Sequence, residues 1–202
     1  MTGRIKVAVI GVGNCSSALV QGVEFYSESR NDLQHYNLGG YRLGDIEFVA
    51  SFDIDRRKVG KDLGQAIFSE PNNFCKVCDV PKTNVTVQMG HILDGAEGIA
   101  KHMLQISDDN PVDVAKVLID EDAEVVVSLL PVGADQASRF YTEMALKTGC
   151  AFINATPSFI VHDKAYIESF EKAGLPLIGD DVMSQIGGTI FHKNILEFLS
   201  RR

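Results

Sequence analysis

Residues 5–17, with the sequence IKVAVIGVGNCSS, decide the fold of this chain. The stretch starts with a short apolar run and breaks at a Gly-Val-Gly turn. Apolar residues then recur three to four positions apart through residues 19–26, as they do on one face of a helix. The sequence therefore predicts a strand, a tight glycine turn and a helix in immediate succession.

This succession is the context that a dinucleotide-binding motif requires. Gly11 permits the tight turn, and Gly13 lets the backbone approach a pyrophosphate closely. The free N–H groups and the positive end of the following helix then face the anion. The match to G-x-G-x-x-G is partial, because Ser16 stands where the third glycine belongs. The alternative is a glycine turn that only joins a strand to a helix.

Length, composition and charge indicate one globular domain of ordinary composition. The chain has 202 residues, of which 45% are hydrophobic and 23% are charged. A net charge of −8 argues against a nucleic-acid partner. The longest apolar runs are far too short to span a membrane, and we expect no signal peptide before Ile5.

The four cysteines, Cys15, Cys75, Cys78 and Cys150, favour free thiols in a reducing cytoplasm. Cys75 and Cys78 have the spacing of a metal or redox site, but the chain offers no second pair to complete a zinc site. We expect two ordinary thiols there. At Cys15, within the glycine turn, we expect a small residue to be needed for space.

An acid follows the second predicted strand, as the dinucleotide-binding motif requires. Residues 47–51 are apolar and β-rich, and Asp53 follows them as the candidate acceptor for the adenosine ribose hydroxyls. Asp53 lies about forty residues after Gly13 rather than about twenty, and a polar surface loop at residues 27–45 accounts for the excess. The alternative is that Asp53 or Asp55 caps the next helix.

The acid also bears on the choice of cofactor. A carboxylate at this position disfavours the 2′-phosphate of NADP, so the sequence favours NAD. Arg56 and Arg57, close by in the chain, count against that choice.

The remaining chain alternates helical and strand patterns. We expect further strands at residues 84–89, 124–130, 150–155 and 176–179, and helices at residues 59–67, 99–106, 111–118, 133–148, 162–173 and 190–202. Pro111 is suited to the first position of its helix. The sequence thus predicts an α/β fold, a doubly wound parallel six-stranded Rossmann sheet. Residues 1–202 form one NAD-binding domain that ends in a terminal helix at 187–202.

A second glycine-rich turn, DDVMSQIGGT at residues 180–189, precedes that last helix. Small and hydroxyl residues at a helix N-terminus are suited to an anion, and we expect a substrate phosphate there. An ordinary cap by Ser184 or Thr189 is the alternative. Asp180 and Asp181 indicate a cation site or a group for proton transfer, with a solvated acidic turn as the alternative.

The last helix has a wide apolar stripe that includes Phe191, Ile195, Phe198 and Leu199. We expect it to pack on this sheet or against something outside the chain.

Taken together, these segments resemble the amino-terminal half of the myo-inositol-1-phosphate synthases (inositol-3-phosphate synthases) of the bacterial and archaeal type. The resemblance covers essentially all 202 residues. It rests on long motifs, namely IKVAVIGVGNCSSALVQGVEFY at 5–26, LGGYRLGDIEFVASFDIDRRKVG at 38–60, EPNN at 70–73, VTVQMG at 85–90, LDG at 93–95, PVDV at 111–114, VVVSLLPVGAD at 125–135, FINATPSFI at 152–160 and GDDVMSQIGGTIFHK at 179–193.

The resemblance implies a concrete reaction in inositol and phospholipid biosynthesis. NAD⁺ oxidises a carbon of D-glucose 6-phosphate, and the new ketone acidifies the neighbouring C–H. An enol forms, an intramolecular aldol step closes the ring, and the same cofactor then reduces the product to 1L-myo-inositol 1-phosphate. The net change is an isomerisation, in which the protein supplies orientation and charge.

The resemblance also assigns roles to residues of this sequence. It implies a catalytic role for Asp181 near the nicotinamide. The implied cofactor-binding residues are Gly11, Gly13, Asn14, Cys15 and Ser16 at the pyrophosphate, Asp53 at the ribose, and Asp62, Ser128, Tyr141, Asn154 and Ser184. The implied substrate-phosphate residues are Ser184, Gly187, Gly188 and Thr189.

The chain departs from the family in its length. Family members continue into a second region, with lysines that are implied to stabilise the developing oxyanion and with much of the oligomer contact. Met183 also stands where relatives often have a lysine. The implied partners are a second copy in a homo-oligomer or a protein with the catalytic half, and a divalent cation is an open expectation.

Three readings of the function stay open at this point. The chain is a fragment or a split subunit of a synthase, a stand-alone NAD-binding module or degenerate paralogue, or a small dehydrogenase with another substrate.

Overall fold

A six-stranded parallel sheet forms the centre of the computed structural model, which describes residues 3–28, 33, 35–96, 103–182 and 188–201. The strand order is β3-β2-β1-β4-β5-β6, with parallel pairing throughout. The strands are β1 (Ile5–Ile10), β2 (Ile46–Asp53), β3 (Val87–Met89), β4 (Val125–Ser128), β5 (Ala151–Asn154) and β6 (Leu177–Ile178). The predicted doubly wound Rossmann sheet is confirmed.

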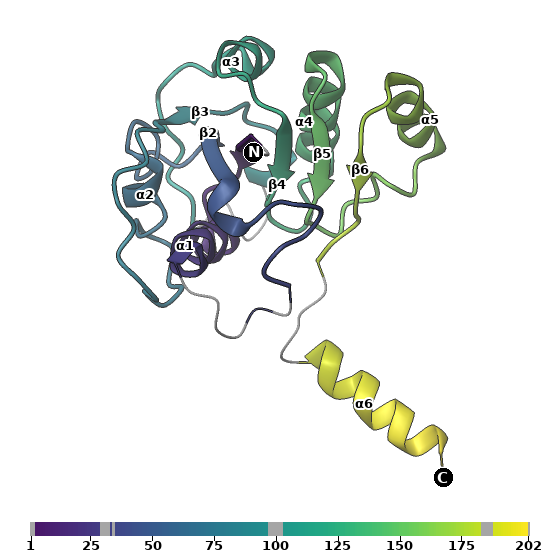
Figure 1. Cartoon of the computed structure of the whole chain (residues 1–202). Helices are drawn as coiled ribbons and strands as arrows, with labels where there is room; N and C mark the ends of the chain where they lie inside the picture. The colour runs from purple at the N-terminus through teal and green to yellow at the C-terminus, as the bar shows by residue number, and fades with distance from the viewer. Residues whose placement is uncertain (1–2, 29–32, 34, 97–102, 183–187, 202) are drawn as a thin grey trace.

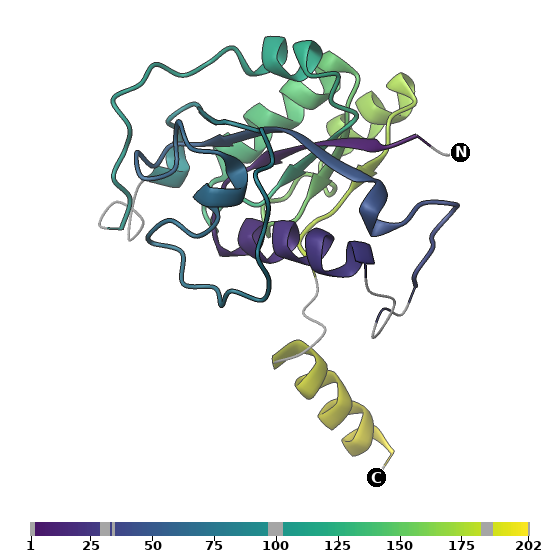
Figure 2. The same cartoon turned by 60° about the vertical axis from the view of Figure 1, so that its left-hand side comes forward.

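Helices cover both faces of the sheet (Figures 1 and 2). The helices are α1 (Asn14–Glu28), α2 (Leu63–Ala66), α3 (Val114–Asp120), α4 (Asp135–Thr148), α5 (Lys164–Ala173) and α6 (Gly188–Ser200), with short 3-10 turns η1 (Leu43–Asp45) and η2 (Asp94–Ala96). In Figure 2, α1 lies on one face of the sheet, and α3, α4 and α5 lie on the other. On one face, α1 and α2 pack against the sheet around a cluster that includes Val12, Val20 and Leu63. On the other face, a larger cluster includes Phe52, Phe152 and Phe170.

Burial on both faces explains why the strands are nearly continuous apolar runs. Val7, Ala8, Val9 and Ile10 are all buried, although successive side chains of a strand point to opposite faces. A strand with one wet face would alternate polar and apolar residues. The apolar run at the start of the chain therefore sets β1 at the centre of the sheet.

Four predicted helices, α2, α3, α4 and α5, begin two to four residues later than the sequence pattern indicated. The helix expected at residues 59–67 is only α2, because Asp62 accepts a hydrogen bond from the Gly64 N–H and caps the helix there. The helix expected from Pro111 begins at Val114, because Asp113 accepts from the Lys116 N–H.

The segment expected to be helical at residues 99–106 is not helical over residues 103–106, where Ile106 forms an isolated bridge with Asp55. The rest of that segment lies outside the described residues. In the predicted loop 27–45, Leu38 and Tyr41 pair around a two-glycine turn, and η1 closes the segment.

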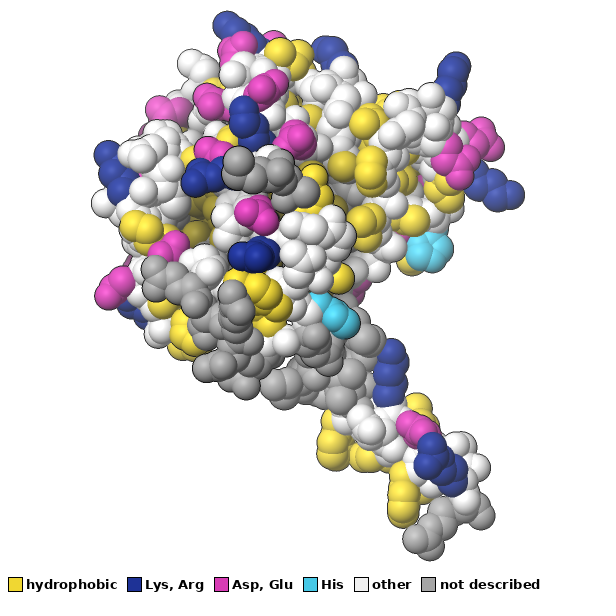
Figure 3. Space-filling view, in the orientation of Figure 1, with side chains coloured by type: hydrophobic (Ala, Val, Ile, Leu, Met, Phe, Trp, Pro, Cys, Tyr) yellow, Lys and Arg dark blue, Asp and Glu magenta, His cyan; other side chains and the backbone are white. Residues whose placement is uncertain are grey.

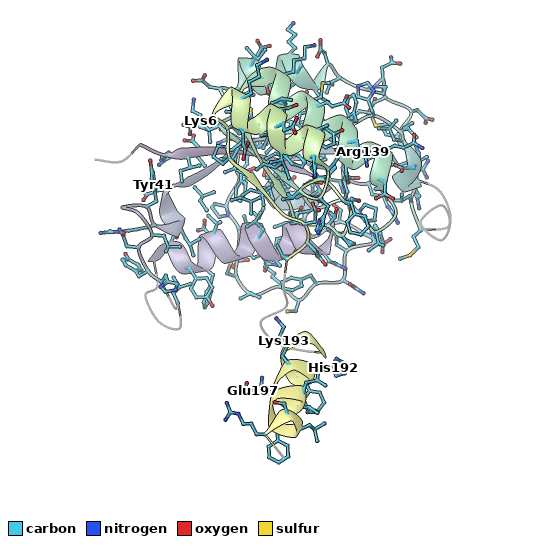
Figure 4. The ribbon with its side chains drawn as sticks, turned by 90° about the vertical axis from the view of Figure 1, so that its right-hand side faces the viewer. Lys6, Tyr41, Arg139, His192, Lys193 and Glu197 are labelled. Carbon is cyan, nitrogen blue, oxygen red and sulfur yellow. The ribbon has the colours of Figure 1, made fainter. Side chains whose placement is uncertain are left out.

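Helix α6 stands clear of the layered body (Figures 1 and 4). The sequence prediction allowed it to pack on this sheet, and it does not: Phe191 and Leu196 are each 64% exposed. Figure 3 shows hydrophobic side chains gathered along this projecting element, and Figure 4 shows His192, Lys193 and Glu197 on it. Among the described residues, no helix has the length and apolar character that crossing a membrane requires.

Helix α4 is capped by a residue from another segment. Its own N-cap residue, Ala134, offers no side-chain hydrogen bond. Asp94 supplies the cap, accepting from the N–H groups of Gln136 at 2.7 Å and Ala137 at 3.1 Å. A carboxylate at this position satisfies free N–H groups and complements the helix dipole.

We expect Asp94→Ala to lower the free energy of unfolding by about 1 kcal/mol, the usual value of an N-cap. The measurement is urea denaturation followed by far-UV circular dichroism. Asp120→Ala, which removes an exposed acid from the last turn of α3, is the control and should cost nothing. Equal stability of the Asp94 variant and the unchanged protein would contradict a capping role.

Candidate functional site

The glycine turn lies at the edge where four neighbouring strands end together. Strand register aligns Ile10 with Phe52 on one side and with Ser128 on the other, and Ser128 with Asn154. The carboxyl ends of β2, β1, β4 and β5 therefore form one edge. Ligands bind at such an edge in open α/β sheets, at the point where the strand order reverses between β1 and β4.

Gly11 fits this place because no other residue would. Its φ is +84°, and a β-carbon there would lie 2.9 Å from the carbonyl oxygen of Leu129. Its N–H donates to the Phe52 carbonyl at 2.8 Å. The turn is thus clamped between the ends of β2 and β4.

Gly13 is different, because a β-carbon there would meet nothing within 4 Å. The Gly13 carbonyl accepts from the Ser17 N–H at 2.9 Å, and the glycine leaves open the space that a β-carbon would fill at the start of α1. The exposed Asn14 and Cys15 begin this helix, whose first N–H groups have no acceptor within it. Ser16, in place of the third glycine, is buried and donates to the Gly11 carbonyl, which braces the turn from inside.

A second segment braces the turn from outside, and sequence reasoning missed it. Asn72 donates to the Val12 carbonyl at 3.0 Å, and the Asn14 side chain accepts from the N–H groups of Asn73 and Phe74 at 2.9 and 3.0 Å. No local pattern signals a contact between residues sixty positions apart. The EPNN segment contributed only to the family resemblance.

Gln21 extends this brace along α1. The side chain is 1% exposed, its amide donates to Ser17 and to the Cys75 carbonyl, and its oxygen accepts from the Val77 N–H at 2.6 Å. The Cys78 thiol donates to the Gln21 carbonyl. The two cysteines of the C-x-x-C pair thus lie in a loop held against α1.

Asp53 lies beside the glycine turn, at the end of β2. Its Oδ2 accepts from the Val12 N–H at 2.7 Å, and its Oδ1 accepts from the Ile54 and Asp55 N–H groups, both at 2.8 Å. A carboxylate has about four acceptor positions, so about one remains for a ribose hydroxyl. Neither Asp53 nor Asp55 caps α2, because Asp62 does.

The two arginines that counted against NAD point elsewhere. Arg57 forms an ion pair with the fully buried Asp55 and donates to the Met103 carbonyl at 2.7 Å. Arg56 donates to the Gln105 side chain at 2.9 Å. Although burial raises the pKa of Asp55, hydrogen bonds from Arg57 hold it below its usual range.

Two other predicted cofactor residues also reach the carboxyl edge. Ser128 is buried at the end of β4, and its hydroxyl has no hydrogen-bond partner among the described residues. Tyr141 is buried on α4, and its hydroxyl lies so close to Gly90 that a β-carbon there would be 2.5 Å away. Burial raises the pKa of Tyr141, so the phenol stays protonated.

The structure does not bring Asp62 to this edge. Its Oδ1 accepts from Gly64 and from both the N–H and the hydroxyl of Thr83, and its backbone bridges Thr86 at the amino end of β3. Asp62 therefore caps α2 through Oδ1, while its buried Oδ2 has no hydrogen-bond partner among the described residues.

The acids after β6 have separate tasks. Asp180 has a side chain 5% exposed, and its carboxylate accepts from Asn154 at 2.7 Å, from the Ile160 and Val161 N–H groups, and from the His162 ring. Burial raises its pKa, but these hydrogen bonds outweigh burial and lower it. A carboxylate filled by donors has little left for a cation.

Asp181 is exposed, and its φ of +69° is unusual for a residue with a side chain. Its N–H donates to the Asn154 carbonyl at 3.1 Å. The Asn154 amide in turn binds Asp180 and the loop after β5. Asn154 therefore holds the backbone of Asp181 at the edge and leaves its carboxylate facing solvent.

The predicted phosphate turn falls largely outside the described residues, which include neither Ser184 nor Gly187. Gly188 and Thr189 begin α6. In the part of the chain that the structure describes, no group of three or more His, Cys, Asp or Glu side chains is arranged to hold a metal ion.

Sequence comparison finds close relatives among curated proteins. The chain is 45% identical over 205 residues to an inositol-3-phosphate synthase of Mycolicibacterium smegmatis, covering 99% of the chain and 56% of the relative. It is 45% identical to an inositol-3-phosphate synthase of Corynebacterium glutamicum, covering 57% of that protein. The chain thus spans just over half the length of these relatives. No protein-family model matches it.

Structural comparison agrees. The crystal structure of Ari2 superposes on 98% of the chain with a TM-score of 0.84 at 33% identity, and the match covers 60% of Ari2. A myo-inositol-1-phosphate synthase-related protein from Thermotoga maritima superposes with a TM-score of 0.68 at 22% identity, covering 98% of this chain and 59% of the other, and supports the fold alone.

Asp180 gives a prediction for stability. Asp180→Asn replaces an acceptor oxygen with a donor that faces N–H groups, so we expect a loss of about 1–3 kcal/mol in the free energy of unfolding at pH 7. Because the pKa is lowered in the folded state, this stabilisation is complete above the unfolded pKa of about 3.9 and disappears as the pH falls through the folded value.

Urea denaturation of both proteins at pH 7 and at about pH 3 measures the effect. The difference in free energy of unfolding between the unchanged protein and the Asp180→Asn variant, here called the gap, should narrow at the acidic pH. The exposed Asp108→Asn serves as the control and should show no gap at either pH. A gap that is unchanged or wider in acid would contradict the assignment.

Proposed function

This chain belongs to the inositol-3-phosphate synthase family, whose amino-terminal half it matches over its whole length, and we propose that it supplies the NAD site for converting D-glucose 6-phosphate to 1L-myo-inositol 1-phosphate. The observation that carries the proposal is the space in front of Gly13. The turn is clamped at Gly11 and braced on two sides, yet open where a diphosphate would lie. That combination is what a preformed anion site at a helix N-terminus needs.

Each residue at the carboxyl edge has a task in this proposal. The N–H groups at Gly13, Asn14 and Cys15 bind the diphosphate, and Asp53 accepts from a ribose hydroxyl. Bound NAD would supply the hydride chemistry of the oxidation and of the final reduction. Ser128, whose buried hydroxyl has no described partner, is free to bind the nicotinamide side of the cofactor.

Asp181 is proposed as the group that handles a proton. Its carboxylate is exposed, while its backbone is held by Asn154. The Asp181 Oδ1 accepts from the Val182 N–H at 2.8 Å, and a fixed backbone with an exposed carboxylate suits a residue that accepts a proton from a substrate hydroxyl. The neighbouring glycine-rich turn, with Ser184, Gly187, Gly188 and Thr189, is proposed to bind the substrate phosphate.

The chemistry also needs positive charge to stabilise an oxyanion, and charge placed for the transition state contributes most to such catalysis. We propose that a synthase carboxyl-terminal half provides it, and that α6 is the contact surface. Phe191, Leu196 and Leu199 on this helix are 58–64% exposed. An apolar stripe of this kind is typical of a surface that a partner covers.

A second candidate function is a stand-alone NAD-binding module. The observation in its favour is that Asp180 and Asn154, at the substrate side of the edge, are satisfied by each other and by backbone groups. A module of this kind binds NAD without acting on glucose 6-phosphate.

The first test blocks the open space at the turn. Gly13→Val puts carbon atoms where the diphosphate would lie, and its β-carbon meets no protein atom within 4 Å, so we expect a folded protein with NAD⁺ affinity reduced at least about tenfold. Gly22→Val is the matched control, because a β-carbon at Gly22 also meets nothing within 4 Å. Titration calorimetry measures both. Unchanged affinity of the Gly13 variant would refute the proposed diphosphate site.

The second test measures whether a carboxyl-terminal half restores activity to this chain. We expect the polypeptide of residues 1–202 to bind NAD⁺ without producing inositol phosphate from glucose 6-phosphate, and to gain activity when mixed with the carboxyl-terminal half of a relative. Phe191→Glu with Leu196→Glu should keep NAD⁺ binding and abolish the gain, whereas Ser200→Glu, on the polar side of α6, should keep both.

Phosphate release from the product after periodate treatment, or mass spectrometry, reports turnover. Activity of residues 1–202 alone would show that no second half is required. NAD⁺ binding with no activity in any mixture would favour the stand-alone module.

A further inference from the structure

The Asp53 carboxylate fills a site that is built for an anion. Three backbone N–H groups, from Val12, Ile54 and Asp55, donate to it at 2.7–2.8 Å. The ammonium group of Lys58 lies 3.8 Å from the same Oδ2 that binds Val12. Converging N–H groups with a nearby cation are the features by which proteins bind phosphate.

Lys58 is unusual because it is buried. The residue is 3% exposed, although lysine is rarely buried unless its charge is paired. The charge pairs with Asp53, whose side chain is itself only 9% exposed. Neighbouring cations are engaged elsewhere, since Arg57 binds Asp55 and Arg56 binds Gln105. Lys58 is therefore the cation that faces the Asp53 carboxylate.

We infer that Lys58 and the three N–H groups form a latent 2′-phosphate site, and that the Asp53 carboxylate occupies it so that NAD is chosen over NADP. This inference rests on the proposed NAD site. Asp53 and a 2′-phosphate compete for one place: both are anions, and both need the donors that surround the carboxylate. The carboxylate also repels any phosphate that approaches, and the ammonium cannot attract it while it is paired.

Lys58 thereby becomes a specificity-determining residue, because it sets the affinity for a 2′-phosphate once Asp53 is removed. Without the carboxylate, the ammonium is a point charge on a flexible stem next to free N–H groups. A 2′-phosphate on the adenosine ribose can then take the vacated place. Without Lys58 as well, the site has lost its charged donor and holds a phosphate poorly.

The test measures NAD⁺ and NADP⁺ binding by calorimetry in four proteins: the unchanged chain, Asp53→Ser, Asp53→Ser with Lys58→Met, and Asp53→Ser with Lys61→Met. Lys61 is the matched control, because it is exposed and donates to Ser69 instead. We expect Asp53→Ser to lose NAD⁺ affinity and to bind NADP⁺ roughly tenfold to a hundredfold tighter than the unchanged chain does.

Adding Lys58→Met should abolish the gain for NADP⁺, and adding Lys61→Met should preserve it. Equal NADP⁺ affinity of the Asp53→Ser protein with and without Lys58 would overturn the inference, as would no gain in Asp53→Ser at all. If Asp53→Ser fails to fold, Asp53→Ala also removes the carboxylate and vacates its place at the three N–H groups, and carries the same comparison.

The unchanged chain separates the two proposals. NAD⁺ binding there, with no role for Lys58 in the variants, refutes only the latent phosphate site. Binding of neither nucleotide to the unchanged chain refutes the proposed NAD site and the inference together.

Discussion

The rest of the structure depends on the close approach of three chain segments at Gly11. Its N–H binds the end of β2, and its α-carbon faces the Leu129 carbonyl at the end of β4 with no room for a side chain. This approach allows β1 to be central, sets the direction in which α1 leaves the sheet, and brings the carboxyl ends of neighbouring strands to one edge. The fold and the candidate site therefore have one origin.

At that edge, side-chain carboxylates accept hydrogen bonds from backbone N–H groups of the turns and helix starts. Asp53 satisfies the N–H groups around the glycine turn, Asp94 satisfies the start of α4, and Asp180 satisfies the loop after β5. Each acid joins segments that lie far apart in sequence. Such contacts rigidify a ligand-binding edge before any ligand arrives, which lowers the ordering cost of binding. They also show that an acid at a ligand edge need not act on the ligand.

Much of the fold was predictable from sequence, because it depends on local patterns. Apolar runs, and at residues 84–89 an alternating pattern rich in β-branched residues, indicated all six strands, and the glycine turn indicated the start of α1. Helix starts were predicted less well where an aspartate cap, as at Asp62 and Asp113, overrode an apolar period. The positions of Gly11, Gly13 and Asp53 beside one another were predictable, because one motif names all three. The braces by Asn72 and Gln21 were not, since they join segments more than fifty residues apart and polar loops give no periodic signal.

The separation of α6 from the layered body has a consequence for how such a protein is put together. The two described hydrophobic cores contain no residue of α6, so the sheet and the helices α1 to α5 bury their apolar side chains without it. Loss of this helix would therefore leave the cooperative unfolding of the layered body unchanged. A rearrangement that exchanged α6 for another sequence would leave both described cores intact.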